Sequence, residues 1–199
     1  MGGVFSLHDL KFYNKADGGY YGKQADNFII ATINALVTNP INTQWCIYKY
    51  IKHLRLSEYH LNNSIFESKL TFKTCIHTLL LLYQYWRLRH YSYITGFQIP
   101  PKVCGPGLRI FHYGWIVINE NARIGSNLTI YPGVEIGHKS RGMGAPQIGD
   151  NCFIGAGAKI FGNIRIGNNV TIAPNAVVIK DVPDNCIVGG VPAKIIKMR

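Results

Sequence analysis

From Ile118 to Val178, aliphatic residues recur at every sixth position of the chain. Only position 142, a glycine, breaks this phase. A period of six fits neither an amphipathic helix nor a simple alternating strand, so each unit is predicted to be a short strand followed by a sharp corner. Three such units close one triangular coil, and stacked coils share an aliphatic core. The pattern therefore predicts a mainly β fold, a parallel β-helix, over residues 97–199.

Glycine and asparagine follow the aliphatic positions of the repeat, and both residue types tolerate the positive backbone angles that sharp corners need. The asparagines that suit this role are Asn127, Asn163, Asn168, Asn169 and Asn175. The phase break falls in a polar, basic and glycine-rich stretch from His138 to Pro146. We expect this stretch to form a loop extruded from one corner, where rigid scaffolds often carry functional residues.

Residues 1–96 lack the six-residue period and are predicted to form a separate helical region. Helices are expected over 26–37, 42–58 and 68–91, because the breaker Asn39-Pro40 divides the first two and Gly96 follows the third. The third predicted helix has a broad apolar face that should pack on another helix or on a neighbouring subunit. The members of this face are Ile76, Leu79, Leu80, Tyr83, Trp86 and Leu88.

The charge balance narrows the choice of partners. A formal net charge of +11 favours an anionic partner, and peripheral proximity to a membrane is one such case. The basic residues form no dense run of the kind that marks a nucleic-acid arm, so we expect no nucleic acid. The five cysteines lack paired metal-ligand spacing, so no metal is expected. No secretory signal is visible, and we expect a cytoplasmic protein.

Two motifs resemble the hexapeptide-repeat acetyltransferases, in the branch that contains serine acetyltransferase. They are Ile-Gly-Ala-Gly-Ala-Lys-Ile at 154–160 and Gly-Val-Pro-Ala-Lys at 190–194. The resemblance covers about residues 97–197. It implies a left-handed β-helix, a homotrimer, and an acetyl-coenzyme A (acetyl-CoA) donor bound between neighbouring subunits.

By the same resemblance, the stretch 105–119 matches the family's catalytic strand, with His112 at its general base. A histidine suits this chemistry, because it can take the proton of an attacking hydroxyl and pass it to the leaving thiolate. His138, at the start of the extruded loop, is the alternative base. The group that orients His112 stays open between side chains at positions 98, 119 and 120 and a backbone carbonyl.

The donor assignments also rest on resemblance. Ala156 and Gly157 match the positions where the family's backbone meets the pantetheine arm. Lys180 and Lys194 are the expected partners of the coenzyme's phosphates.

The chain departs from the serine-specific enzymes where those enzymes carry charged or polar side chains. The matching positions here are Gln98, Phe111, Gly144 and Ala145. A zwitterionic acceptor would lack the charged and hydrogen-bonding side chains that bind its ammonium and carboxylate. This loss favours a sugar hydroxyl in surface polysaccharide synthesis as the acceptor. Tyr113 and Trp115 are then the expected acceptor platform. Serine O-acetylation is the alternative acceptor reaction, and a non-catalytic β-helix scaffold is the alternative of another class.

Overall fold

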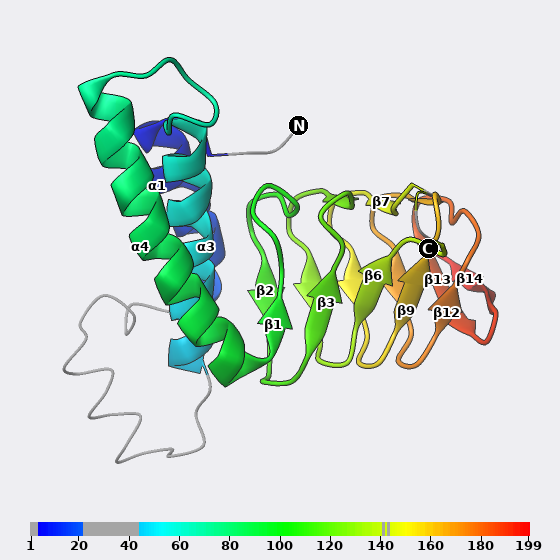
Figure 1. Ribbon diagram of the computed structural model, residues 1–199. Coiled ribbons are helices and arrows are strands. Elements are labelled where there is room, and N and C mark those ends of the chain that lie inside the picture. Colours follow the sequence, from blue (N-terminus) through cyan, green and yellow to red (C-terminus); the bar gives the residue numbers. More distant parts are fainter. Residues whose placement is uncertain (1–3, 22–43, 141, 143) are drawn as a thin grey trace, which may run out of the picture. The chain divides into compact units, whose positions relative to one another are not determined.

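The computed structural model describes residues 4–21, 44–140, 142 and 144–199, and it divides into two compact units. A helical unit ends at Thr95, and a β-helix unit runs from Gly96 to Arg199 (Figure 1). None of the helices in the described part is long and apolar enough to cross a membrane.

The helical unit contains α1 (Leu7–Tyr21), α3 (Gln44–Asn62) and α4 (Phe72–Thr95). Helix α3 packs against both α1 and α4. The predicted helices over 42–58 and 68–91 correspond to α3 and α4, and each observed helix ends about four residues later than expected. The helix expected over 26–37 lies outside the described residues.

Helix α1 was not expected from the sequence, but it carries a start signal. The Ser6 hydroxyl accepts a hydrogen bond from the Asp9 amide at 3.1 Å, and the Asp9 carboxylate accepts one from the Ser6 amide at 2.9 Å. This reciprocal capping box satisfies amides that the first helical turn leaves unpaired. A serine followed three residues later by an acid is the pattern that could have identified the helix.

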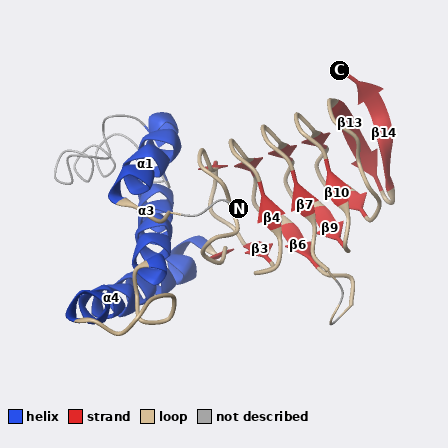
Figure 2. Cartoon of the chain, turned by 90° about the horizontal axis from the view of Figure 1, so that it is seen from above, coloured by secondary structure: helices blue, strands red, loops and turns tan. Residues whose placement is uncertain are grey.

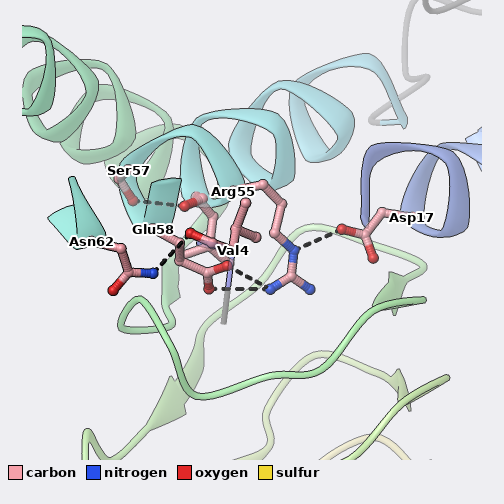
Figure 3. Close-up of polar contacts among 7 residues, drawn as sticks. Val4, Asp17, Arg55, Ser57, Glu58 and Asn62 are labelled. Carbon is pink, nitrogen blue, oxygen red and sulfur yellow. Dashed lines mark hydrogen bonds and ion pairs between the residues drawn. The ribbon is translucent and has the colours of Figure 1, made fainter. Parts of the chain in front are cut away.

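Arg55 is the largest fully buried side chain of the helical unit. Its guanidinium donates to Asp17 of α1 at 2.8 Å and to Glu58 of α3 at 3.1 Å (Figure 3). The Tyr13 ring lies 4.8 Å from the guanidinium carbon. A buried cation is tolerated only with such partners, so this cluster fixes how α1 sits on α3.

Helix α4 buries its more polar side. Its buried residues lie along one narrow seam, at steps of three, four or seven residues: Thr74, His77, Leu81, Gln84, Tyr91 and Thr95. Most of the apolar face predicted from the sequence is instead exposed, including Leu79 and Trp86. Most of this face therefore does not pack on another helix among the described residues, whereas the other expected partner, a neighbouring subunit, stays a prediction. Because α4 is apolar on nearly every side, its pattern did not decide which side faces α3.

The β-helix unit is a left-handed coil of short parallel strands on three faces, seen from above in Figure 2. Sheet A contains β1 (Phe97–Gln98), β3 (Ile116–Ile118), β6 (Glu135–Gly137), β9 (Lys159–Phe161) and β12 (Val177–Val178). Sheet B contains β4 (Arg123–Ile124), β7 (Gln147–Ile148) and β10 (Arg165–Ile166). Sheet C contains β2 (Arg109–Ile110), β5 (Thr129–Ile130), β8 (Phe153–Ile154), β11 (Thr171–Ile172), β13 (Cys186–Gly190) and β14 (Ala193–Met198).

The aliphatic series forms the core as predicted, because equivalent isoleucines pair in register between coils. Ile110, Ile130 and Ile154 stack in sheet C, for example, and each is fully buried. The strand alternation then turns the neighbouring residues outward.

The corners between sheets B and C form a ladder of left-handed backbone positions. They are held by Gly107, Asn127, Asn151, Asn169 and Asn185, each with a positive φ. Asn127 donates to Asn151 at 3.0 Å, and Asn169 donates to Asn185 at 2.8 Å. The expectation was right for Asn127, Asn169 and Asn175, whereas Asn163 and Asn168 are not among the residues with positive φ.

The stretch that breaks the repeat leaves the coil at one corner and returns without disturbing the pairing. Strand β6 ends at Gly137, and β7 begins at Gln147. Strand β7 still pairs in parallel with β4 and β10. The last strand, β14, pairs antiparallel with β13 and so departs from the repeat.

Candidate active site

The three sheets form the faces of a triangular prism. The corners that lead from sheet C to sheet A define one edge of this prism, here called the histidine edge (111–115, 131–134, 155–158 and 173–176). Backbone hydrogen bonds connect its successive corners. Gly133 donates to the carbonyl of Trp115, Gly157 to that of Pro132 and Asn175 to that of Ala156, at 2.7, 2.9 and 2.8 Å.

His112 lies exposed on the histidine edge, between β2 and β3. Its ring makes a tilted contact with Tyr131, 6.1 Å between centroids. In the part of the chain that the structure describes, the imidazole has this ring contact and no hydrogen-bond partner. Its nitrogens are therefore accessible from solvent.

Three aromatic side chains lie beside His112, Phe111 and Tyr131 on the histidine edge and Phe153 in β8 of sheet C. Phe111 stacks on Tyr131 with ring centroids 4.9 Å apart and planes 8° from parallel. Phe153 makes a tilted contact with the Tyr131 ring, with centroids 5.4 Å apart. We call Phe111, Tyr131 and Phe153 the aromatic stack. It forms an apolar wall next to the histidine.

Trp115, one of the expected platform residues, has an ammonium over its ring. The Lys159 Nζ lies 3.8 Å from the Trp115 centroid. It also donates to the carbonyl of Gly133 at 2.9 Å and pairs with Glu135 at 3.6 Å. Lys159 was not singled out from the sequence, because these partners come from different coils. Tyr113, the other expected platform residue, is half-buried.

His138 lies on a different edge, where sheet A leads to sheet B. Asn119 Oδ1 accepts from the Asn121 amide at 2.9 Å, which turns Asn119 Nδ2 toward His138 Nδ1 at 3.0 Å. A neutral His138 that accepts at Nδ1 carries its proton on Nε2. This tautomer offers no free nitrogen to receive a proton, and a single chain does not bring His138 and His112 together.

The side chains considered for orienting His112 lie elsewhere. Asn119 and Glu120 follow β3, on the same edge as His138. Gln98 is exposed in β1, where it pairs with Val117 of sheet A.

Ala156 and Gly157 share the histidine edge with His112. Their corner lies two coils further along, which corresponds to about 10 Å at the usual strand spacing. The equivalent positions in the coils before and after Ala156 are Pro132 and Pro174, which have no N–H. Ala156 is exposed, and its amide makes no hydrogen bond within the described residues. It is a free donor at that corner.

The two lysines expected at the coenzyme phosphates do not join this corner within one chain. Lys180 lies exposed after β12, on the edge that carries His138. Lys194 lies in β14, opposite Gly189. Among the described residues, no group of three or more histidine, cysteine or acidic side chains could hold a metal ion.

Gly144 and Ala145 lie where the extruded loop returns to the coil. Ala145 is buried, and a Cβ at Gly144 would approach the side chain of Asn163 to 2.7 Å. The loop therefore returns tightly against the coil at these positions.

Two family models match the β-helix unit. Residues 145–180 match the bacterial transferase hexapeptide model, and residues 116–141 match the hexapeptide repeat of succinyl-transferase. Serine acetyltransferase of Staphylococcus aureus strain Mu50 is 46% identical over 108 residues, which covers 53% of this chain and 51% of the relative. The chain thus spans about half the length of this curated relative.

Solved structures extend the likeness to both units. Serine acetyltransferase of Neisseria gonorrhoeae in complex with serine is 30% identical, covers 96% of this chain and 71% of that one, and gives a TM-score of 0.63. A serine acetyltransferase in complex with CoA gives the same TM-score of 0.63 at 22% identity over 96% of this chain and 71% of that one, and shares the fold.

The repeated coil is that of a hexapeptide-repeat transferase. Within that class, the chain belongs to the hexapeptide-repeat acetyltransferases, in the branch that contains serine acetyltransferase.

Proposed function

We propose that this chain is an acetyl-CoA-dependent O-acetyltransferase in which His112 is the general base. The observation that carries the proposal is the histidine edge, where an exposed imidazole and the free amide of Ala156 lie two coils apart. A base for the acceptor and a donor for the coenzyme arm are the two functions that the reaction requires.

His112 removes the proton of the acceptor hydroxyl as the oxygen attacks the thioester carbonyl. A C–O bond forms and the C–S bond breaks. The proton held by the imidazole then passes to the thiolate, which leaves as free coenzyme A. An acetyl ester and a thiol result, and no covalent intermediate on the protein is needed.

Ala156 fits the pantetheine arm, because an amide carbonyl of the arm can accept the free N–H at that corner. The neighbouring corners cannot do this, since Pro132 and Pro174 lack the donor. Lys180 and Lys194 can meet the coenzyme's phosphates only if different subunits contribute to one site. Their assignment therefore rests on the proposed trimer.

L-serine is the first acceptor to test, because the relatives matched at 46% and 30% identity are serine acetyltransferases. It carries the hydroxyl that the reaction needs.

A neutral sugar hydroxyl is the second candidate, and the surroundings of His112 favour it. Phe111 packs in the aromatic stack, and Ala145 is buried, so neither can form a polar contact with the serine ammonium or carboxylate. Each charge-assisted contact left unmade costs about 1.5–3 kcal/mol. The aromatic stack instead offers an apolar surface to the C–H face of a sugar ring.

A thiol-release assay on the full chain tests the proposal. Acetyl-CoA is supplied with L-serine, with simple sugars or with lipid-linked glycans, and the wild type is compared with His112→Ala. We expect acceptor-dependent release that the variant loses. Serine turnover with kcat/KM near the ordinary enzyme range, about 10⁴ M⁻¹s⁻¹ or above, selects L-serine, whereas glycan transfer with little serine turnover selects the sugar. If no hydroxyl acceptor causes thiol release, the proposed enzymatic function is wrong and a non-catalytic scaffold is favoured.

A further inference from the structure

The side of α4 that faces away from α3 carries large apolar side chains at regular spacing. Three- and four-residue steps connect the members of this outer stripe, and His90 holds the one remaining position. The outer stripe comprises Phe72, Ile76, Leu79, Tyr83, Trp86 and Tyr93. Leu79 is 68% exposed, Trp86 63% and Tyr93 76%. An apolar surface of this extent is uncommon on a protein that meets only water.

The exposed apolar arc is broader than the outer stripe alone. Leu80 and Leu82 flank it on opposite sides and are themselves exposed. At about 100° per residue, the apolar side chains span an arc of roughly 160°. A single packed helix covers a narrower seam, like the one that α4 already buries against α3.

The charges around the outer stripe have one sign. Lys73 and Arg87 lie on one flank of the arc and Arg89 on the other, and α4 contains no aspartate or glutamate. Arg87 and Arg89 also lie over aromatic rings of the same helix, Tyr91 at 5.2 Å and Tyr93 at 5.8 Å. The charged group of the exposed Arg89 therefore stays at the border between the apolar arc and water, whereas Arg87 donates to the hydroxyl of the buried Tyr91 at 2.9 Å.

We propose that the outer stripe of α4 is a docking surface for an anionic lipid bilayer, in which the helix lies in the plane of the interface. Tryptophan and tyrosine favour the headgroup level, where one end of the ring is apolar and the other is wet. Lysine and arginine on the flanks then meet lipid phosphates. The formal charge of +11 favours the same partner at longer range.

A second copy of α4 is a poorer occupant of the same surface. Two identical helices would bring only basic residues to the borders of their contact, without a carboxylate on either side to neutralise them. Bulky aromatics at four of the six positions also differ from the branched aliphatic residues that pack well between paired helices.

Vesicle sedimentation with the full chain tests the docking surface independently of acetyl transfer. We expect association with vesicles that contain phosphatidylglycerol, weaker association with phosphatidylcholine alone, and a decline as salt is raised. Leu79→Ser with Trp86→Ser should weaken association at least ~tenfold. Lys73→Gln with Arg89→Gln should weaken it by roughly fivefold per charge.

Lys11→Gln with Lys15→Gln, the same charge change on α1, is the matched control and should retain most of the association.

Tryptophan emission reports whether α4 itself enters the interface. Emission of the wild type should shift to shorter wavelength on anionic vesicles, and Trp86→Phe should remove most of that shift while sedimentation persists. This second readout decides the question if the double serine variant does not fold. No association with anionic vesicles, or equal association by the charge variant and its α1 control, would overturn the proposal. It also fails if the double serine variant dissociates an oligomer and vesicles do not bind, because the stripe is then an interface between copies.

Discussion

The two histidines of the β-helix unit differ in what their rings contact. Asn119 donates to Nδ1 of His138, whereas His112 is exposed and contacts only the Tyr131 ring within the described residues. We expect His112→Ala to lower kcat by at least ~10²-fold, the usual effect of removing a general base. Steady-state kinetics and thermal unfolding of the same preparation measure this.

His138→Ala is the matched control for that variant, and it should keep most of the wild-type kcat. Near-normal turnover in His112→Ala together with a large loss in His138→Ala would move the base to the extruded loop.

Lys159 joins three coils at one point, through Trp115, Glu135 and the carbonyl of Gly133. We expect Lys159→Met to lower the free energy of unfolding by about 1–2 kcal/mol, because a charged hydrogen bond and a cation–π contact are lost while the half-exposed ion pair adds little. Urea unfolding measures this. Lys139→Met, in the exposed loop, should leave the midpoint unchanged, and equal midpoints for the two variants would contradict the stabilising role of Lys159.

At the scale of elements, the asparagines at the corners between sheets B and C adopt a left-handed backbone conformation that affects the stability of the coil. Asn169 has a φ of 56° and donates to Asn185. We expect Asn169→Ala to cost about 1–2 kcal/mol, because alanine keeps the Cβ that conflicts with the left-handed conformation and loses the short polar side chain with which asparagine tolerates it. Asn169→Gly loses the same hydrogen bond without that conflict, so it should cost less. Chemical unfolding of both variants measures the difference, and equal losses would refute the backbone explanation.

Helices α3 and α4 bury a pair of histidines whose protonation opposes folding. His60 Nδ1 and His77 Nδ1 lie 3.0 Å apart. Burial lowers the pKa of His60 to about 4, and it also lowers the pKa values of His77 and His53. The unfolded chain, with a histidine pKa near 6.5, therefore binds more protons between these values. The helical unit should lose stability as the pH falls from about 6.5 toward 4.

Hydrogen exchange in α3 and α4 at several pH values measures this loss, with the strands of the β-helix as an internal reference. His60→Gln should flatten the dependence, because it removes the group whose pKa burial lowers to about 4. Unchanged protection of α3 and α4 down to pH 4 would exclude the mechanism.

The core of the β-helix could be predicted from the sequence. Each inward isoleucine contacts its equivalent in the next coil, and the six-residue period identifies these inward positions. Contacts between outward side chains could not. The partners of Lys159 depend on the register between coils, and the hydrogen bond of His138 depends on how one corner bends. The orientation of α4 could not be predicted either, since Gln84 is buried because its side chain pairs with His53 of α3, and Thr74 because its hydroxyl donates to backbone carbonyls at the start of α4, not because of their hydropathy.

At the scale of the whole molecule, we expect a homotrimer formed through the β-helix. The resemblance implies donor sites between subunits, and apolar side chains such as Trp115, Phe153 and Ile179 are exposed on the single chain. Light scattering at micromolar concentration should give three times the 22.3 kDa of one chain. The trimer should survive Leu79→Ser with Trp86→Ser on α4, and a monomer would contradict the prediction.

The extruded loop leaves and rejoins the coil between β6 and β7 without shifting the pairing of β7 with its neighbours. A corner of this fold can therefore gain or lose residues while every other position keeps its place, and the spacing along the histidine edge changes only in whole-coil steps of about 4.8 Å. The length of this loop and the geometry of the histidine edge are consequently separable in evolution. Insertions at 138–146 can change which side chains this loop carries, while His112 and the corner of Ala156 keep a fixed separation.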